Sequence, residues 1–87
     1  MAVVLVPPLM RDLTGGIAHV TAPGTTVGQV LVSLDSIYPG FRSRLCQGDD
    51  ISPYIGVVVD GVSSHLRLLQ PVGDGSEIQF LPALQGG

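Results

Sequence analysis

The hydrophobic positions along this chain predict four strands and one helix. Residues 3–6 and 54–59 are almost continuously apolar, which is typical of strands that a second layer covers. Residues 17–21 and 77–81 alternate apolar and polar positions, so each should form a strand with one face in solvent. In the first of these, His19 falls on the polar side of the alternation, and we expect it to face solvent.

Two prolines interrupt the first apolar run. Residues 3–10 are nearly all apolar, but Pro7 and Pro8 have no N–H to donate to a neighbouring strand. The first strand must therefore stop near Val6, bulge, or turn these positions away from its partner. Residues 11–16 are polar and glycine-rich, which predicts a hairpin with a long loop between the first two strands.

The main helix should begin after Thr26. Thr26 and Gln29 have the spacing of a capping box, in which the Thr hydroxyl binds the third helical amide and the Gln side chain reaches back. The apolar residues then recur at intervals of three and four, which predicts one buried stripe. That stripe consists of Val27, Val30, Leu31, Leu34, Ile37 and Tyr38. Pro39-Gly40 should end the helix.

The other segments are less regular. Residues 41–50 contain two arginines and an acidic pair, and we expect a surface excursion with one short turn of helix. Asp60-Gly61 predicts a tight turn after the strand at 54–59. The pattern of residues 62–72 is ambiguous between an irregular segment and a short strand.

Together these elements predict an α+β domain with a mixed sheet of four to five strands and one main helix packed on one face. If the first strand is central and the last lies beside it, the two run parallel and a long crossover joins them. We expect residues 1–81 to form this domain. Residues 82–87 should form a flexible tail that leaves the sheet directly and ends in Gly-Gly.

The composition argues against several classes of partner. The 87 residues are 45% hydrophobic and 13% charged, which favours one small globular domain over a disordered chain. The formal net charge is −3, and no basic stripe with interleaved aromatic residues is present, so nucleic acid is not an expected partner. The apolar residues 1–6 lack a basic leader and stop at two prolines. We therefore expect neither a signal peptide nor a membrane span, and a cytoplasmic protein.

The sequence offers no convincing catalytic or metal site. Asp60, Ser63, Ser64 and His65 are the residue types of a hydrolase, but they crowd around one turn, and no Gly-x-Ser-x-Gly elbow is present. The single cysteine, Cys46, has no Cys-x-x-Cys companion, and the two distant histidines do not have zinc spacing. We expect Cys46 to be a buried or half-buried apolar residue. No catalytic residue and no metal ligand are assigned.

The remaining reactive group is the carboxylate of Gly87. An α-carboxylate is ionised at neutral pH, which makes it a competent oxygen nucleophile toward the α-phosphorus of ATP but an unreactive acyl donor. Gly86 and Gly87 have no Cβ, so this part of the backbone can pass through a channel too narrow for side chains. From Pro82 to Gly87 an extended chain reaches roughly 20 Å. These residues favour a carrier that a partner activates, and an uninformative chain end is the simpler alternative.

Several short motifs, taken in order, resemble the MoaD/ThiS family of sulfur carriers. They are Thr14-Gly15-Gly16 in the first hairpin, Tyr38-Pro39-Gly40 after the helix, Asp74-Gly75 before the last strand, and Leu81-Pro82-Ala83 leading to Gly86-Gly87. Each motif is weak alone, and their order and spacing carry the resemblance. It covers essentially the whole chain and implies a β-grasp, ubiquitin-like fold.

The resemblance also implies a role for the last residues. In such carriers the terminal glycine, here Gly87, is adenylated by an E1-like activating enzyme that uses MgATP and is then converted to a thiocarboxylate. Gly86 corresponds to the penultimate glycine that keeps the tail slim. The residues expected to contribute to partner docking are Leu81, Pro82, Ala83, Leu84 and Gln85. Phe80 is expected to belong to the sheet core.

A carrier of this kind is a co-substrate or small subunit, not an enzyme, and holds no permanently bound cofactor. Its implied partners are the activating enzyme, a sulfur donor, and either a molybdopterin-synthase large subunit or a cysteine-synthase-like enzyme. Molybdopterin-synthase small subunits often carry Phe-Pro-Pro where this chain has Leu81-Pro82-Ala83, which looks closer to the CysO type used for cysteine synthesis.

The receiving pathway therefore stays open between molybdopterin and CysO-like cysteine synthesis, with thiamin less favoured. Two further alternatives are a ubiquitin-like modifier conjugated through Gly87 and a plain β-grasp interaction domain.

Overall fold

The structure, a computed structural model, describes residues 1–82. The chain forms several short strands, one main helix, α1, and two 3₁₀ segments, η1 and η2. In chain order the elements are β1 (Ala2–Leu5), η1 (Pro8–Thr14), β2 (His19–Ala22), α1 (Val27–Ile37), α2 (Phe41–Leu45), β3 (Cys46–Gln47), β4 (Asp50–Ile51), β5 (Ile55–Val59), β6 (Val62–Ser63), η2 (Arg67–Leu69) and β7 (Glu77–Pro82).

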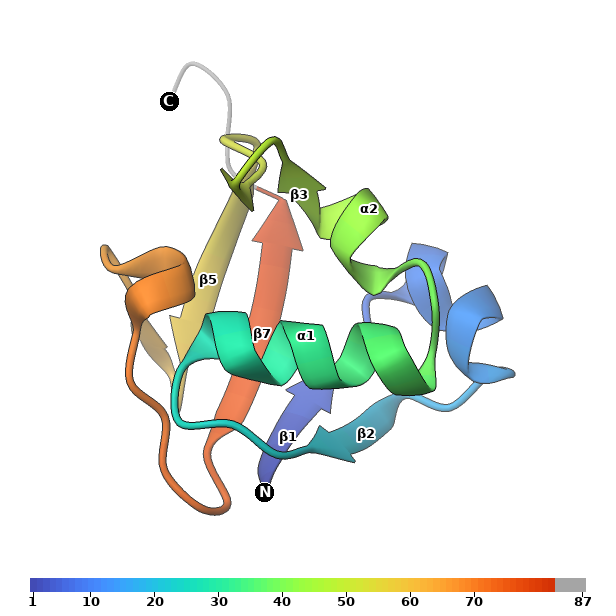
Figure 1. Ribbon diagram of the computed structural model, residues 1–87, viewed down its shortest axis with the longest axis horizontal. Helices are drawn as coiled ribbons and strands as arrows, with labels where there is room; N and C mark the ends of the chain where they lie inside the picture. Colours follow the sequence, from blue (N-terminus) through green and yellow to red (C-terminus); the bar gives the residue numbers. More distant parts are fainter. Residues whose placement is uncertain (83–87) are drawn as a thin grey trace.

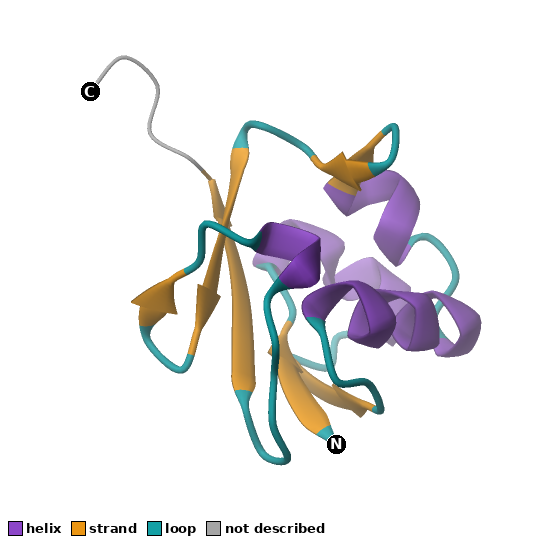
Figure 2. Cartoon of the chain, turned by 60° about the vertical axis from the view of Figure 1, so that its left-hand side comes forward, coloured by secondary structure: helices purple, strands orange, loops and turns teal. Residues whose placement is uncertain are grey.

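Five of these strands form a mixed sheet in the order β2-β1-β7-β5-β6, and α1 crosses one face of it (Figure 1). The first and last strands, β1 and β7, run parallel, whereas the other neighbouring pairs are antiparallel. Figure 2 shows the longer helical segments together on one side of the sheet. This confirms the predicted α+β fold, including the parallel pairing of the first and last strands at its centre.

The core lies between the sheet and α1. Strand alternation turns every second side chain toward the helix, so that Val4 of β1 and Ile78 of β7 are both fully buried. From α1, the buried residues are Val27, Val30, Leu31 and Leu34. Ile37 is predicted to belong to this stripe but is 54% exposed, because it is the last residue of α1 and lies at the edge of the stripe that the buried residues define.

The predicted capping box begins α1. Thr26 Oγ1 accepts a hydrogen bond from Gln29 N at 3.2 Å, and Gln29 Oε1 accepts one from Thr25 N at 2.8 Å. The Gln side chain thus reaches one residue further back than the standard box. These two hydrogen bonds satisfy backbone N–H groups at the start of the helix, which explains why α1 begins at Val27.

The prediction of a surface excursion at residues 41–50 is wrong in part. Phe41 and Leu45 of α2 and Ile51 of β4 are buried and extend the core beyond the sheet. Asp35, on α1, fixes the start of α2 because its Oδ1 accepts hydrogen bonds from the backbone N of Gly40 and Arg42, each at 3.1 Å. Arg42 and Arg44 lie on the exposed side of the short amphipathic α2, and the acidic pair Asp49 and Asp50 is exposed at the start of β4.

The loop of the first hairpin is more ordered than its composition indicated. Its residues 8–14 form η1, and the second strand begins at His19, two residues later than expected. His19 is exposed, as predicted, whereas Thr14 is buried and donates its hydroxyl to Ile17 O at 2.7 Å. Gly15 and Gly16, both with positive φ, make the turn after η1.

Within the ambiguous segment 62–72, only Val62–Ser63 is a strand. Asp60 and Gly61 both have positive φ, as a two-residue hairpin turn requires, and they connect β5 to β6. Arg67 of η2 also has positive φ, and its Nη2 donates to the carbonyl oxygens of Ile51 and Ser52 at 2.9 and 2.8 Å. The segment is therefore an irregular crossover held in place by side-chain hydrogen bonds.

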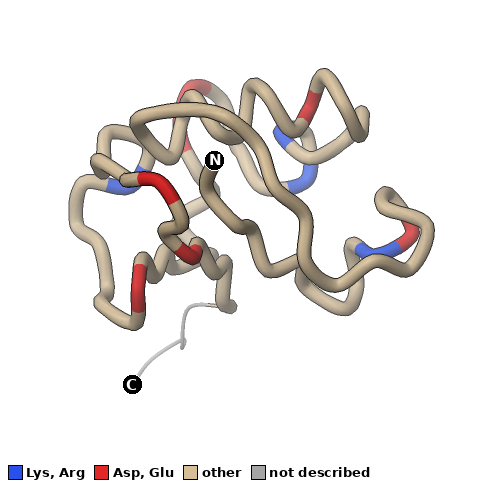
Figure 3. The backbone as a smooth tube through the Cα atoms, turned by 90° about the horizontal axis from the view of Figure 1, so that it is seen from below, with Lys and Arg blue, Asp and Glu red and all other residues tan. Residues whose placement is uncertain are grey.

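The described surface has no continuous basic face. Figure 3 shows the arginine positions at separate places along the backbone, with acidic positions near them. Among residues 1–82, no helix has the length and apolar character needed to cross a membrane.

Replacing Phe41 tests whether α2 is part of the core. Phe41→Ala should lower the free energy of unfolding by about 3–5 kcal/mol, because a fully buried aromatic side chain is lost and a cavity remains. Urea denaturation followed by circular dichroism measures this change. Arg42→Ala, at the exposed neighbouring position, should stay within about 0.5 kcal/mol of the parent chain. If Phe41→Ala lowers the free energy of unfolding by less than about 1 kcal/mol, α2 is not part of the core.

Candidate docking site at the end of strand β7

Strand β7 carries the described part of the predicted docking segment to the edge of the domain. Leu81 is 46% exposed, whereas Phe80 before it is buried in the core, as expected. Pro82 is paired with Ile55 at the end of the ladder with β5, so the strand includes the first residue of the segment that we defined as a tail. The other predicted residues lie outside the described part of the chain: Ala83, Leu84, Gln85, Gly86 and Gly87.

The parallel ladder between β1 and β7 ends before β7 does. Its last pair is Leu5 with Gln79, and the same register would place Val6 opposite Phe80 and then Pro7 opposite Leu81. The chain instead turns into η1 after β1, while β7 continues alongside β5 alone. The final part of β7 is therefore paired on one side and open on the other.

Prolines occupy the positions that would extend this ladder. Val3 N donates to Ser76 O at 2.7 Å. In a parallel ladder every second residue of each strand donates to the other strand, so the ladder could continue past Leu5 only if the backbone nitrogens of Pro7 and Pro82 donated hydrogen bonds. Neither nitrogen carries a hydrogen. The carbonyl of Pro7 instead accepts from Met10 N at 2.8 Å, in the first turn of η1.

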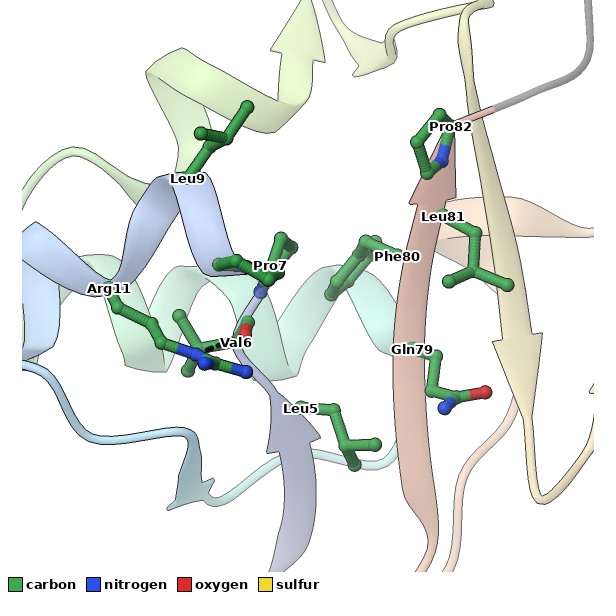
Figure 4. A pocket seen from close by; sticks show the side chains of 10 residues that line it. Leu5, Val6, Pro7, Leu9, Arg11, Gln79, Phe80, Leu81 and Pro82 are labelled. Atoms are coloured by element: carbon green, nitrogen blue, oxygen red, sulfur yellow. Dashed lines mark hydrogen bonds between the residues drawn. The ribbon is translucent and has the colours of Figure 1, made fainter.

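The space where the ladder stops is an apolar groove of about 350 Å³, which we call the terminal groove (Figure 4). Its apolar lining comes from the end of β1, from η1 and from the end of β7. The main contributors are Leu5, Pro7, Leu9, Phe80, Leu81 and Pro82. A second depression, of about 200 Å³, adjoins it and adds Tyr54 and Ile55 from the other side of β7.

Several apolar side chains around the terminal groove are exposed. Leu9 is 91% exposed and Tyr54 is 61% exposed, and together with Leu81 they give this end of the domain a largely apolar surface. A contiguous apolar surface of this kind marks an interaction site more often than scattered exposed leucines do. This apolar surface lies where β7 ends, next to the point at which residues 83–87 follow.

Sequence reasoning identified Leu81 and Pro82 but missed the side chains from the beginning of the chain. Leu9 follows Pro7 and Pro8 in an apolar run that cannot remain a strand. That interruption was the available signal, because an apolar residue forced out of the sheet must be buried elsewhere or exposed. Only the pairing of β1 with β7 places it beside the end of the last strand.

A network of charged groups holds η1 against α2. Arg44 Nη1 and Nη2 donate to the two carboxylate oxygens of Asp12 at 2.7 Å each, and Nη1 also donates to Leu9 O at 3.3 Å. The hydrogen bonds from Arg44 lower the pKa of Asp12, and the carboxylate in turn raises the pKa of Arg44. The network fixes the backbone that presents Leu9.

The described residues do not assemble a catalytic centre from the hydrolase-like residues. Ser64 Oγ donates to Gln70 Oε1 at 2.7 Å, and Asp60 Oδ1 accepts from Glu77 N at 2.8 Å, so both make structural hydrogen bonds. Cys46 is half-buried, as predicted, and burial raises the pKa of its thiol, which keeps it protonated at neutral pH. Residues 1–82 bring together no group of three or more His, Cys, Asp or Glu side chains that could hold a metal ion.

Comparison with known proteins gives relatives that cover most or nearly all of the chain. The chain is 32% identical over 91 aligned residues to the sulfur carrier protein CysO of Mycobacterium tuberculosis, with 97% of this chain and 96% of the relative covered. It is 33% identical to small archaeal modifier protein 3 of Haloferax volcanii over 64 aligned residues, which cover 71% of this chain and 70% of that protein.

The fold has solved counterparts. A chain in the crystal structure of the Amycolatopsis orientalis BexX/CysO complex superposes with a TM-score of 0.90 at 30% identity, and each chain is covered completely. This agreement confirms the β-grasp architecture that the sequence resemblance implied. The model of the ThiS family matches residues 4–87, nearly the whole sequence. The chain therefore belongs to the ThiS family.

Proposed function

We propose that this protein is a sulfur carrier that holds sulfur as a thiocarboxylate on Gly87. The observation that carries the proposal is its similarity, over 97% of its length, to a protein named as the sulfur carrier CysO. The position of the terminal groove supports it, because a docking surface at the end of β7 suits a partner that acts on the residues that follow.

Two chemical steps by a partner would load the sulfur. An E1-like adenylating enzyme binds MgATP, and a carboxylate oxygen of Gly87 attacks the α-phosphorus, which forms an acyl-adenylate and releases pyrophosphate. Hydrosulfide (HS⁻) supplied by a donor then attacks the acyl carbon, so that a C–S bond forms and the C–O bond to AMP breaks, which leaves the thiocarboxylate and free AMP. The partner supplies the metal, the nucleotide and the stabilisation of charge. This chain supplies the acyl group and the docking surface, so it acts as a co-substrate.

Gly86 and the docking residues have separate roles in this proposal. Gly86 keeps the backbone slim enough to enter the partner's active site, since it has no Cβ. Leu81 and Pro82, with Leu9 and Pro7 of the terminal groove, hold the domain against the partner. Ala83, Leu84 and Gln85 extend between the two and contribute further contacts. The reaction would take place in the cytoplasm, where ATP is abundant.

For the acceptor of the sulfur, we propose CysO-like cysteine synthesis, with a cysteine-synthase-like enzyme as the second partner. The similarity to CysO and the Leu81-Pro82-Ala83 segment both favour it over molybdopterin synthesis. The BexX/CysO complex supports the more general point that a carrier of this fold assembles with another protein.

A second candidate function is protein modification through Gly87. The similarity to small archaeal modifier protein 3 favours it, since a modifier and a sulfur carrier share the activation of a terminal carboxylate. The two functions differ in the nucleophile that attacks the acyl-adenylate or its successor, which is a substrate amine for the modifier and sulfur for the carrier.

Intact mass measurement tests sulfur loading directly. Protein isolated from its own cells should contain a fraction in which one oxygen is replaced by sulfur, and incubation with the cognate adenylating enzyme, MgATP and a sulfur donor should increase that fraction. A variant without Gly86 and Gly87 provides the control and should never gain this mass. Absence of the sulfur-containing species under both conditions would overturn the proposal.

The modifier candidate makes a different prediction. If Gly87 is conjugated to other proteins, protease digestion of the proteome should leave a remnant of this chain's terminal residues on substrate lysines. Expression of the variant without Gly86 and Gly87 should remove those remnants. A proteome without them excludes the modifier function and leaves sulfur loading unaffected.

The role of the terminal groove in activation can be measured with Leu9→Asp. The substitution places a carboxylate in an apolar contact, and burial of one leucine is worth roughly 1.5–3 kcal/mol, so kcat/KM for pyrophosphate release by the adenylating enzyme should fall at least about tenfold. Leu69→Asp is a matched control, because Leu69 is 75% exposed on η2, outside the groove. Equal kinetics for the two variants would contradict a docking role for Leu9.

A further inference from the structure

Arg11 is the charged residue in the lining of the terminal groove. It lies on η1, is partly exposed, and its Nε donates to Val6 O at 3.2 Å. That bond holds the side chain along the groove wall. In Figure 4 its head lies beside Val6 and Leu5, at the end of the groove opposite Pro82.

The guanidinium of Arg11 has unused donors. Among residues 1–82, its Nη1 and Nη2 make no hydrogen bond or ion pair. The adjacent carboxylate, that of Asp12, is already bound by both terminal nitrogens of Arg44. Because Asp12 is engaged in that way, the positive charge of Arg11 is not compensated within the described structure.

We propose that Arg11 recognises a carboxylate on a partner segment whose apolar side chains fill the terminal groove. This rests on the proposed function, and the partner is the adenylating enzyme. When apolar side chains cover the groove, they exclude water from the guanidinium, and a hydrogen-bonded carboxylate then gains strength from the lower local dielectric. Residues that dominate binding at protein interfaces are often arginines, and they lie in well-packed regions from which water is excluded.

The partner segment binds through side chains and not as an added strand. The open edge of β7 could pair with a new strand only through the alternate positions that face away from β5, and one of these is Pro82, which has no N–H. Across the groove, Pro7 also lacks a donor. The apolar side chains and the guanidinium therefore carry the recognition.

The carboxylate of Gly87 is a poor candidate for the same contact. To reach Arg11 from Pro82, the chain would have to reverse, which takes about four residues, and then return along β7 to the level of Gln79, about 10 Å back. A turn that starts at Pro82 would place residue 85 opposite Pro82 and Gly87 opposite Phe80, which is one position short of Gln79 even with no residue to spare. The length of this segment and its starting point therefore favour an acidic group from another protein.

Peptide binding followed by NMR tests the proposal without the partner enzyme. The probes are two capped peptides, acetyl-Leu-Glu-Leu-Leu-amide and the same peptide with glutamine in place of glutamate. The glutamate peptide should bind about tenfold more tightly, as expected for a hydrogen bond to a charged group, and should shift the Nε–H resonance of Arg11. Raising the salt concentration should reduce this preference only in part, because a charge pair that is covered by apolar side chains is screened less than an exposed one.

Variants test whether Arg11 causes the preference for the glutamate peptide over the glutamine peptide. Arg11→Gln should abolish it while leaving the affinity for the glutamine peptide unchanged, which shows that the groove is intact. Arg11→Lys should retain only part of it, since lysine keeps the charge but not the planar fork. Arg42→Gln removes the same charge from an exposed residue outside the groove and should keep the full preference.

Three results would overturn the proposal: equal affinities for the two peptides, no binding of either, or a preference that survives in Arg11→Gln. A chain shortened to residue 82 gives a fourth. If its Arg11 resonance differs from that of the full chain without peptide, the groove is occupied by residues 83–87. The experiment uses neither ATP nor Gly87, so its failure would leave the thiocarboxylate proposal standing, and loss of sulfur loading would leave the peptide preference unaffected.

Discussion

The parallel pairing of β1 with β7 is the contact on which both the fold and the candidate site depend. It joins the first strand of the chain to the last, and every other element lies between them in sequence. Such a contact costs loop-closure entropy before it gains anything, so it forms only because both strands are buried on one face by the helix. Val4 and Ile78, which are paired across it, are both completely buried.

The same pairing creates the terminal groove at the point where it stops. Pro7, after β1, and Pro82, at the end of β7, both lack a backbone N–H, so neither can extend the hydrogen-bonded ladder between β1 and β7. The early chain turns into η1 and places Leu9 beside the end of the last strand. Phe80 belongs to both regions, since it is buried in the core and also forms part of the groove wall. Core stability and the shape of the docking surface are therefore coupled through this side chain.

This arrangement suits a protein whose chemistry is carried out by others. A central strand supported by β5 along its whole length gives a rigid starting point for the residues after Pro82. If the terminal groove is a docking surface, as proposed, its order reduces the entropy lost on association. Under the proposed function, this domain positions the terminal residues and the partner carries out the reaction.

The local pattern of the sequence determined which residues form most of the elements. Periodicity identified α1 and the strands around β5 and β7, and the capping box located the start of the helix, because these signals depend on neighbours within four residues. The order of the turns and the final glycines also indicated the family. Three local interpretations failed or stayed open: Ile37 is exposed, Phe41 is buried, and only Val62–Ser63 of the segment 62–72 is a strand.

These failures share one cause with the part of the site that sequence reasoning missed. Whether Ile37 or Phe41 is covered depends on where the helix lies over the sheet, and that is set by packing between segments distant in sequence. Likewise, Leu9 and Arg11 line the same groove as Leu81 only because β1 and β7 pair. The sequence alone specified most of the regular elements, indicated the family and singled out Gly87 as the candidate reactive residue. The tertiary structure decided which early side chains surround the end of β7, because a groove is formed by surfaces that only long-range pairing brings together.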